Sequence, residues 1–287
     1  MTRTTVSDPE ESQWLVSPED WQAFFDAYER VVLIANSDEV AIAEVVKKHG
    51  EGALFVFFNK VYKVLDAPFE APCLLVARSS PSGANIVYRR EVEEVLSYFR
   101  KDALLGILNL ACADTERFSP IAAFEGRRAG RLSLAGYFRE FYPTTHLPTS
   151  GFALALWLAE TCRTEVHLEG FSAKRSLRWK LFADHDWTFE QTSLRLLARA
   201  GRLHMNNVEP SNAYVELARR FPEIGDGAVA AAAVEVLGNR LESASLAIDN
   251  LVSLTKFQGR VDRLLRRLKP ATRKQRDKAA SGKSGPV

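Results

Sequence analysis

Short apolar runs recur along the chain, and stretches with the periodicity of amphipathic helices lie between them. The runs rich in Val, Ile, Leu and Phe that we expect to form buried strands are Arg30–Asn36, Ala53–Asn59, Pro72–Arg78, Asp102–Leu110, Glu165–Gly170 and Arg202–Met205. The helical stretches are Ser37–Lys48, Arg90–Arg100, Gly151–Thr161 and Thr188–Ala200. Apolar residues that are continuous rather than alternating indicate strands covered on both faces. The alternation of strands and helices therefore predicts an α/β fold with a single Rossmann-like, doubly wound parallel sheet.

The pattern changes after about Phe221. Residues 226–268 are helix formers without proline, and apolar residues such as Val234, Leu237 and Leu241 recur at spacings of three and four. Such a seam packs on the body of the protein or on a partner helix, so a homo-oligomer is one expectation. We divide the chain into an N-terminal lead-in (1–25), an α/β domain (26–223), a C-terminal helical segment (224–269) and a basic disordered tail (270–287).

Positive charge is concentrated at the C-terminus. Residues 256–287 hold 11 Lys and Arg and 2 Asp and Glu, a net +9, whereas residues 1–255 hold 27 and 34, a net −7. Because the basic residues are not interleaved with aromatic ones, we expect the tail to bind an anionic membrane surface and no nucleic acid. The alternative is a tail that is solvated or that attracts nucleic acid through its charge alone.

No apolar signal core precedes the first strand, and apolar runs such as Gly151–Ala159 are far shorter than the roughly 18–20 residues that span a bilayer. We therefore expect a cytoplasmic protein that is peripheral on the inner face of the inner membrane. Cys73, Cys112 and Cys162 are widely spaced and lack a metal-ligand pattern, so we expect buried, reduced thiols.

Small polar residues follow the first two predicted strands. Asn36 and Ser37 come after the first strand, and Asn59 ends the second. In a doubly wound sheet, ligands bind outside the carboxyl ends of the strands. A polar turn there can present backbone N–H groups to an anion, and an asparagine amide can read a base or a ribose edge. The alternative is that Ser37 simply caps the following helix.

A second polar segment, Pro148-Thr149-Ser150-Gly151, opens an apolar helix. Thr149 and Ser150 are residue types that cap helix N-termini, and Gly151 would let a ligand approach the backbone. His146, just upstream, could contact a phosphate. Helix capping without a ligand is the alternative interpretation of this segment.

His185 offers the sharpest chemistry in the chain. An imidazole with a pKa near ~6.5 can accept a proton from a hydroxyl group at neutral pH. The alternative is a structural or exposed histidine. His167 lies inside a predicted strand, where a core histidine is the default expectation. Nothing in the sequence around His49 or His204 indicates a functional role.

Charged residues around His185 add two further hypotheses. Asp184 and Asp186 form an Asp-X-Asp pair, whose carboxylate oxygens suit Mg²⁺ or Mn²⁺. Upstream, a basic run could bind phosphate or carboxylate, or could be a solvated loop. The residues of this run that we single out are Arg175, Arg178 and Lys180.

The order of these segments resembles the sialyltransferases, most closely the compact bacterial type, over roughly residues 30–215. The resemblance implies a GT-A-like variant of the Rossmann-like fold, with residues 26–223 as a CMP-sugar-binding catalytic domain. It implies His185 as the general base of an inverting reaction that uses neither a metal nor a cofactor. The residues implied to line the CMP pocket are Asn36, Ser37, Asn59, Thr149, Ser150, Gly151, Gly170 and Phe171.

The chain departs from that family at several positions. Ala35 stands where a glycine is usual, and Phe57 where an arginine is often found. The bacterial type uses tyrosines on the donor phosphate, but no tyrosine lies between Gly170 and His185. The donor contacts would then come from His146, Arg175, Arg178 or Lys180, and the sugar could be either sialic acid or Kdo, another CMP-activated ulosonic sugar.

We therefore expect an inverting, metal-independent glycosyltransferase that moves a CMP-activated ulosonic sugar onto a bacterial surface glycan or a lipid-linked acceptor. Two alternatives remain open at the level of the sequence. One is a metal-dependent nucleotide-sugar transferase that uses Asp184 and Asp186. The other is a non-catalytic nucleotide-binding or scaffold protein.

Overall fold

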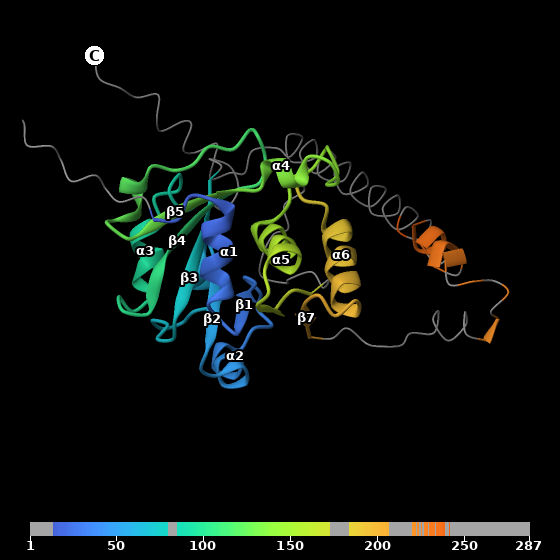
Figure 1. Cartoon of the computed structure of the whole chain (residues 1–287), viewed down its shortest axis with the longest axis horizontal. Helices are drawn as coiled ribbons and strands as arrows, with labels where there is room; N and C mark the ends of the chain where they lie inside the picture. The colour runs from blue at the N-terminus through green and yellow to red at the C-terminus, as the bar shows by residue number, and fades with distance from the viewer. Residues whose placement is uncertain are drawn as a thin grey trace, which may run out of the picture. The chain divides into compact units, whose positions relative to one another are not determined.

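The computed structural model describes residues 14–79, 85–172 and 184–206, together with some positions between 220 and 241. The chain divides into two compact units, Met1–Val208 and Glu209–Val287. Every helix and strand labelled in Figure 1 belongs to the first unit.

A seven-stranded sheet forms the centre of the first unit (Figure 1). Its strands are β1 (Arg30–Ile34), β2 (Ala53–Phe58), β3 (Cys73–Arg78), β4 (Leu104–Ala111), β5 (Ala129–Ser133), β6 (Glu165–Glu169) and β7 (His204–Met205). The strands pair in parallel in the order β5-β4-β3-β2-β1-β6-β7. The direction of winding reverses between β1 and β6, which is the topological switch point where such sheets bind ligands. The predicted Rossmann-like, doubly wound α/β fold is confirmed.

Helices cover both faces of this sheet. They are α1 (Pro18–Asp26), α2 (Ile42–His49), α3 (Val92–Ser97), α4 (Ala135–Phe138), α5 (Ser150–Thr161) and α6 (Trp187–Arg199), with 3₁₀ helices η1 (Val61–Lys63) and η2 (Ile121–Phe124). Trp21 of α1, Phe152 of α5 and Leu194 of α6 share one core with one face of the sheet. Val45 of α2 and Val95 of α3 belong to a second core on the opposite face. Because both faces are covered, the polar strand ends are left as the natural place for a ligand.

The N-terminal residues expected to lead into the domain are part of it from Trp14 onward. Ser17 and Asp20 form a capping box that starts α1, and Trp21 and Phe25 are fully buried in the core. Trp14 also donates its backbone N–H to the carbonyl of Ala129 on β5. The helix was not predicted, although Ser17 and Pro18 mark its start and Trp21, Phe24 and Phe25 recur at helical spacing.

Strand β5 was not predicted either, since its sequence Ala-Gly-Arg-Leu-Ser contains a single large apolar residue. Its glycine has a packing role that the pattern cannot show. A Cβ atom on Gly130 would lie 2.4 Å from the carbonyl oxygen of Leu15, and one on Gly106 of β4 would lie 2.2 Å from the Trp14 ring. The two glycines therefore make room for the N-terminal segment to cross this edge of the sheet.

In the second unit, the described positions 227–228, 230–232, 234–238 and 241 are helical, as predicted for the start of the segment 226–268. Val234, Leu237 and Leu241 of the predicted seam are exposed. The remainder of that segment and the basic tail (270–287) lie outside the described residues. Within the part of the chain that the structure describes, no helix is both long and apolar enough to cross a bilayer.

Candidate functional site

Asn36 and Asn59 lie at the carboxyl ends of neighbouring strands, and each uses its amide to join two strand ends. The Nδ2 atom of Asn36 donates to the carbonyl of Phe58 at 2.8 Å, and the Oδ1 atom of Asn59 accepts from the backbone N–H of Arg78 at 2.9 Å. Asn59 has a φ of 46°, a left-handed conformation that asparagine tolerates better than most residues. The Oδ1 atom of Asn36 is buried and has no partner among the described residues, so it can accept a hydrogen bond from a ligand.

Ser37 does not cap the next helix, so that alternative was wrong. Helix α2 begins at Ile42 after Ala41, and the Oγ atom of Ser37 instead accepts from the backbone N–H of Glu39 at 3.2 Å. A Cβ atom built on Gly170 would lie 3.2 Å from that of Ser37. Ser37 and Gly170 therefore face each other across the switch point, one after β1 and the other after β6.

A cavity of about 330 Å³ opens at this point, between α2, α6 and the ends of β6 and β7. Gly170 and Phe171 line it. The φ of Gly170 is +76°, and a Cβ atom there would lie 2.3 Å from Val40. Only glycine fits this turn without strain, because both the backbone conformation and the neighbouring side chain exclude a larger residue.

Glu169 forms a buried ionic network on the wall of the cavity. Its carboxylate accepts from the Nζ atom of Lys48 at 2.7 Å, lies 2.8 Å from Nε2 of His49, and accepts from the amide of Asn206. Burial opposes the ionisation of Glu169, but the hydrogen bonds from Lys48 and His49 outweigh it and hold its pKa below the usual value. The wall therefore carries a fixed charge that is balanced within the protein.

Gly151 has a different neighbour from the one we expected. The ring of Phe171 occupies the space beside it, since a Cβ atom on Gly151 would lie 2.8 Å from a ring carbon of Phe171. The glycine thus lets the segment after β6 pack against the start of α5. A ligand could approach the backbone of Gly151 only if the Phe171 ring moved.

Thr149 caps α5 as predicted, because its Oγ1 atom accepts from the backbone N–H of Phe152 at 3.2 Å. Glu190 of α6 holds this capping residue in place. The Glu190 carboxylate accepts from the backbone N–H of Thr149 at 2.7 Å and from its hydroxyl at 2.6 Å, and the Tyr142 hydroxyl donates to it at 2.8 Å. Burial raises the pKa of Glu190, although these hydrogen bonds act in the opposite direction. Sequence inspection marked Glu190 only as part of a helix start and missed this contact.

His185 is held by the backbone segment that precedes α5. Its Nδ1 atom lies 2.6 Å from the carbonyl oxygen of Leu147, and the N–H of Leu147 donates back to the carbonyl of Asp184 at 2.8 Å. A carbonyl can only accept, so Nδ1 carries the proton and Nε2 carries the lone pair. Burial lowers the pKa of His185 below its ordinary value, against the opposing effect of the Leu147 hydrogen bond. The imidazole is therefore neutral at pH 7 and able to accept a proton at Nε2.

Arg78, at the end of β3, connects the strand ends to the start of α5. Its Nε atom donates to Glu116 at 2.7 Å, and its Nη1 atom donates to the carbonyl of Pro148 at 2.8 Å and lies 3.4 Å from the hydroxyl of Ser150. The side chains of Arg78 and Glu116 are only 9% and 2% exposed. We did not single out this pair: Arg78 was recognisable as a strand-end residue, but nothing near Glu116 in the sequence marks it.

These contacts join the described candidate residues into one rim at the carboxyl edge of the sheet. Asn36 touches the end of β2, Asn59 touches Arg78, and Arg78 reaches the segment that begins α5. That segment in turn contacts Phe171 after β6 and His185 and Glu190 at the start of α6. Residues far apart in the sequence thus meet where the fold leaves space for a ligand.

The other candidates do not strengthen the metal hypothesis. Asp186 is the N-cap of α6, and its Oδ1 atom accepts from the N–H of Phe189 at 2.9 Å. That carboxylate oxygen is already used by the helix.

His146, a candidate for contact with a phosphate, is half-buried, and its Nδ1 atom lies 2.8 Å from the hydroxyl of Thr145. The basic candidates Arg175, Arg178 and Lys180 lie outside the described residues.

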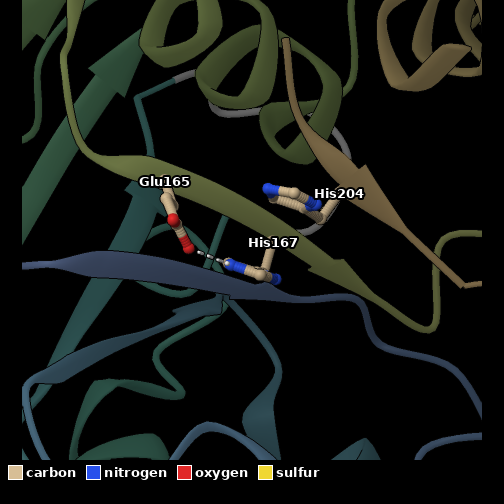
Figure 2. Close-up of side chains that lie close together, drawn as sticks. All are labelled: Glu165, His167 and His204. Carbon is tan, nitrogen blue, oxygen red and sulfur yellow. Dashed lines mark hydrogen bonds and ion pairs between the residues drawn. The ribbon is translucent and has the colours of Figure 1, made fainter. Parts of the chain in front are cut away.

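A separate histidine cluster lies on the face of the sheet that α2 covers. Figure 2 shows Glu165 and His167 on β6 beside His204 on β7, the register partner of His167. Nε2 of His167 lies 3.2 Å from Oε2 of Glu165, and the rings of His167 and His204 stack with centroids 4.4 Å apart. Burial lowers the pKa of His167. We expected His167 to be a core residue and found no signal at His204, because sequence spacing alone does not reveal which strands are neighbours.

Comparisons with known proteins leave the family undetermined. No protein-family model matches the chain, and a search of curated proteins finds no match. The function must therefore be argued from the fold and from the chemistry of the rim.

Proposed function

We propose that this protein is an inverting, metal-independent glycosyltransferase that uses a CMP-activated ulosonic sugar, either sialic acid or Kdo, as its donor. The observation that carries the proposal is His185. A neutral imidazole of fixed tautomer lies beside the Pro148–Gly151 segment, at the ligand-binding edge of a doubly wound sheet. The resemblance in segment order to the sialyltransferases supplies the donor class.

In the proposed reaction, His185 acts as the general base. Its Nε2 atom takes the proton from the acceptor hydroxyl while that oxygen forms a bond to the anomeric carbon of the donor. The bond from that carbon to the phosphate oxygen breaks on the opposite side, and its electron pair leaves with CMP. Proton acceptance from the nucleophile typically contributes 10²–10⁴-fold to such a step, an order-of-magnitude figure.

The donor would lie across the switch point. The unpaired Oδ1 atom of Asn36 supports a hydrogen bond from a cytosine amino group or a ribose hydroxyl. Ser37, Asn59 and Gly170 line the adjoining strand ends, and Thr149 and Ser150 lie beside them at the start of the 12-residue helix α5, where Glu190 already occupies the N–H and the hydroxyl of Thr149. For the donor phosphate or carboxylate we propose His146, Arg175, Arg178 and Lys180.

The experiment is CMP release from CMP-sialic acid and from CMP-Kdo, with full-length protein and a mixture of bacterial glycan acceptors. The matched variant is His185→Asn, whose side-chain amide can still donate to the Leu147 carbonyl but lacks the Nε2 lone pair. We expect turnover of one donor by the wild type and a fall of about 10²–10⁴-fold in kcat in the variant. CMP affinity should be retained, which separates loss of the base from loss of the fold.

Three results would contradict the proposal. Full turnover by His185→Asn would exclude His185 as the base, and a wild-type rate that depends on added Mg²⁺ or Mn²⁺ would favour the transferase that uses Asp184 and Asp186. CMP binding without turnover of either donor would favour a non-catalytic nucleotide-binding or scaffold protein.

We further propose that the C-terminal tail holds the enzyme at an anionic membrane surface, on the inner face of the inner membrane, where a lipid-linked acceptor would be available. Residues 256–287 carry a net charge of +9, and each basic residue near such a surface contributes about 1 kcal/mol. Binding to vesicles that contain anionic lipid should weaken with added salt and be lost on truncation after Leu254. Equal binding by the truncated chain would contradict this placement.

A further inference from the structure

The cluster of Glu165, His167 and His204 has the ligand set that a divalent transition metal prefers. One imidazole nitrogen from each histidine and one carboxylate oxygen lie within 4.8 Å of one another. Ligands of a tetrahedral zinc ion lie about 2.0–2.1 Å from the metal and therefore about 3.3 Å from each other. The Glu165 oxygen and the His167 nitrogen, 3.2 Å apart, already have that separation.

Strand geometry explains why these three side chains converge. Glu165 and His167 are two residues apart on β6, so their side chains point to the same face of the sheet. His204 is paired in register with His167 on the neighbouring strand, which places its side chain on that face as well. The arrangement is therefore set by the backbone of two paired strands rather than by flexible loops.

Packing fixes one of the three side chains, and the other two are exposed and can change conformation. The side chain of His167 is 17% exposed and packs against the ring of His49, with centroids 4.8 Å apart. Glu165 and His204 are exposed. The rings of His167 and His204 are nearly parallel, at 15°, so a shared metal requires the His204 ring to turn until its lone pair points toward that of His167.

We propose that Glu165, His167 and His204 bind one Zn²⁺ ion, with the fourth coordination position open to water. Two imidazoles favour zinc over Mg²⁺ or Ca²⁺, which prefer oxygen ligands. The ion would connect β7, which is only two residues long, to β6. It would thereby hold Asn206, the residue after β7, against Glu169 on the wall of the cavity.

The test uses the full chain with any affinity tag removed and any bound metal stripped by chelation and dialysis. Zinc chloride is titrated by calorimetry, and the melting temperature is followed in parallel. We expect one zinc ion per chain and a rise in melting temperature that grows with zinc concentration, whereas magnesium chloride should produce neither effect.

Variants then locate the ion. His204→Ala and Glu165→Gln should each weaken zinc affinity, His204→Ala by at least about 100-fold, because even partners outside the coordination shell contribute roughly 10–100-fold. His146→Ala, which removes a histidine outside the cluster, should bind zinc like the wild type. X-ray absorption of the zinc-loaded wild type should show two imidazole ligands.

Unchanged affinity in both cluster variants, fewer than two imidazoles on the bound zinc, or no zinc binding by the wild type would each overturn the proposal. If circular dichroism shows that His204→Ala fails to fold, Glu165→Gln and the wild-type absorption spectrum still decide the outcome, since Glu165 is exposed and its loss leaves the fold intact.

Discussion

Glu190 shows how a single buried carboxylate holds two parts of the rim together. It is 2% exposed and accepts hydrogen bonds from Thr149 and Tyr142, so it fixes the start of α5 against α6. Removing a buried, hydrogen-bonded charge usually leaves its partners unsatisfied. The conservative change to glutamine keeps the shape and one acceptor oxygen, replaces the other oxygen with an NH₂ donor, and removes the ionisation.

We predict that Glu190→Gln changes the pH dependence of stability. The pKa of Glu190 is raised in the folded state, so the folded chain binds its proton more tightly than the unfolded chain does. Its contribution is therefore fully present below the unfolded pKa and is lost as pH rises through the folded pKa. Urea unfolding from pH 4 upward should show the wild type losing stability relative to Glu190→Gln as pH rises. A constant difference between the two proteins would contradict the raised pKa.

We predict that Gly170→Ala destabilises the protein more than Gly126→Ala. Both glycines have a positive φ, +76° and +68°, so both substitutions carry a backbone cost of about 1–2 kcal/mol. Only at Gly170 would the added Cβ meet a neighbour, the Val40 side chain at 2.3 Å, whereas at Gly126 it meets nothing within 4 Å. In denaturant unfolding, Gly170→Ala should lose about 1–3 kcal/mol more of its unfolding free energy than Gly126→Ala does. Equal losses in the two variants would show that the Val40 side chain moves aside without an energetic penalty, and would contradict the prediction.

At the residue scale, the sequence predicted a local helix cap better than the contacts between distant residues. Thr149 caps α5 as its residue type indicates, whereas the role of His185 as a base stays a prediction. The sequence could not show that Leu147 fixes the tautomer of His185, because that contact depends on how two loops meet. The zinc ligands were hidden for the same reason, since His204 gains meaning only through the register of β7 with β6.

At the scale of elements, the N-terminal segment and two glycines form one packing unit at the edge of β5. The Trp14 ring lies where a side chain on Gly106 would be, and the backbone of Leu15 lies beside Gly130. The carbonyl of Leu15 also accepts from the N–H of Arg131 at 2.8 Å. The segment therefore closes an otherwise open strand edge.

We predict that Trp14 and Gly106 are strongly coupled in a double-mutant cycle. Gly106→Ala should cost about 1–3 kcal/mol in the wild type because the new methyl group displaces the Trp14 ring. In the Trp14→Ala background the same change should cost little, because the ring is gone. Unfolding free energies of the four proteins should give a coupling of about 1–3 kcal/mol, and additive values would contradict the contact.

Most of the strands that the sequence predicted have long apolar runs. Strands β1 to β4 are buried on both faces, so most of their positions are apolar. In strand β6 only Val166 and Leu168 are apolar, and the other three residues are polar. Strand β5 and helix α1 are stabilised by close backbone approach and by a few large aromatic residues. The local sequence of β5 carries little periodicity, so this strand could be found only from the fold. Helix α1 does carry sequence signals, its capping box and the spacing of Trp21, Phe24 and Phe25, which the prediction overlooked.

At the scale of the whole molecule, the winding of the sheet explains why the candidate residues meet. Strand order runs outward from β1 to β5 and then returns to β6 on the other side of β1. The segments after β1 and β6 therefore diverge and leave a cavity lined by α2, Gly170 and Phe171. The ring of Phe171 also packs beside Gly151 at the start of α5, next to the segment that holds His185.

The pH dependence of kcat/KM for CMP release tests this account most directly. The pKa of His185 is lowered by burial, and a general base must be unprotonated to act. We therefore predict that kcat/KM of the wild type is constant near neutral pH and falls tenfold per pH unit below a pKa that is under ~6.5, the ordinary histidine value. His185→Asn should lack this decline and retain only a low residual rate. A wild-type profile without that decline, or the same profile in the variant, would contradict the assignment of His185 as the base.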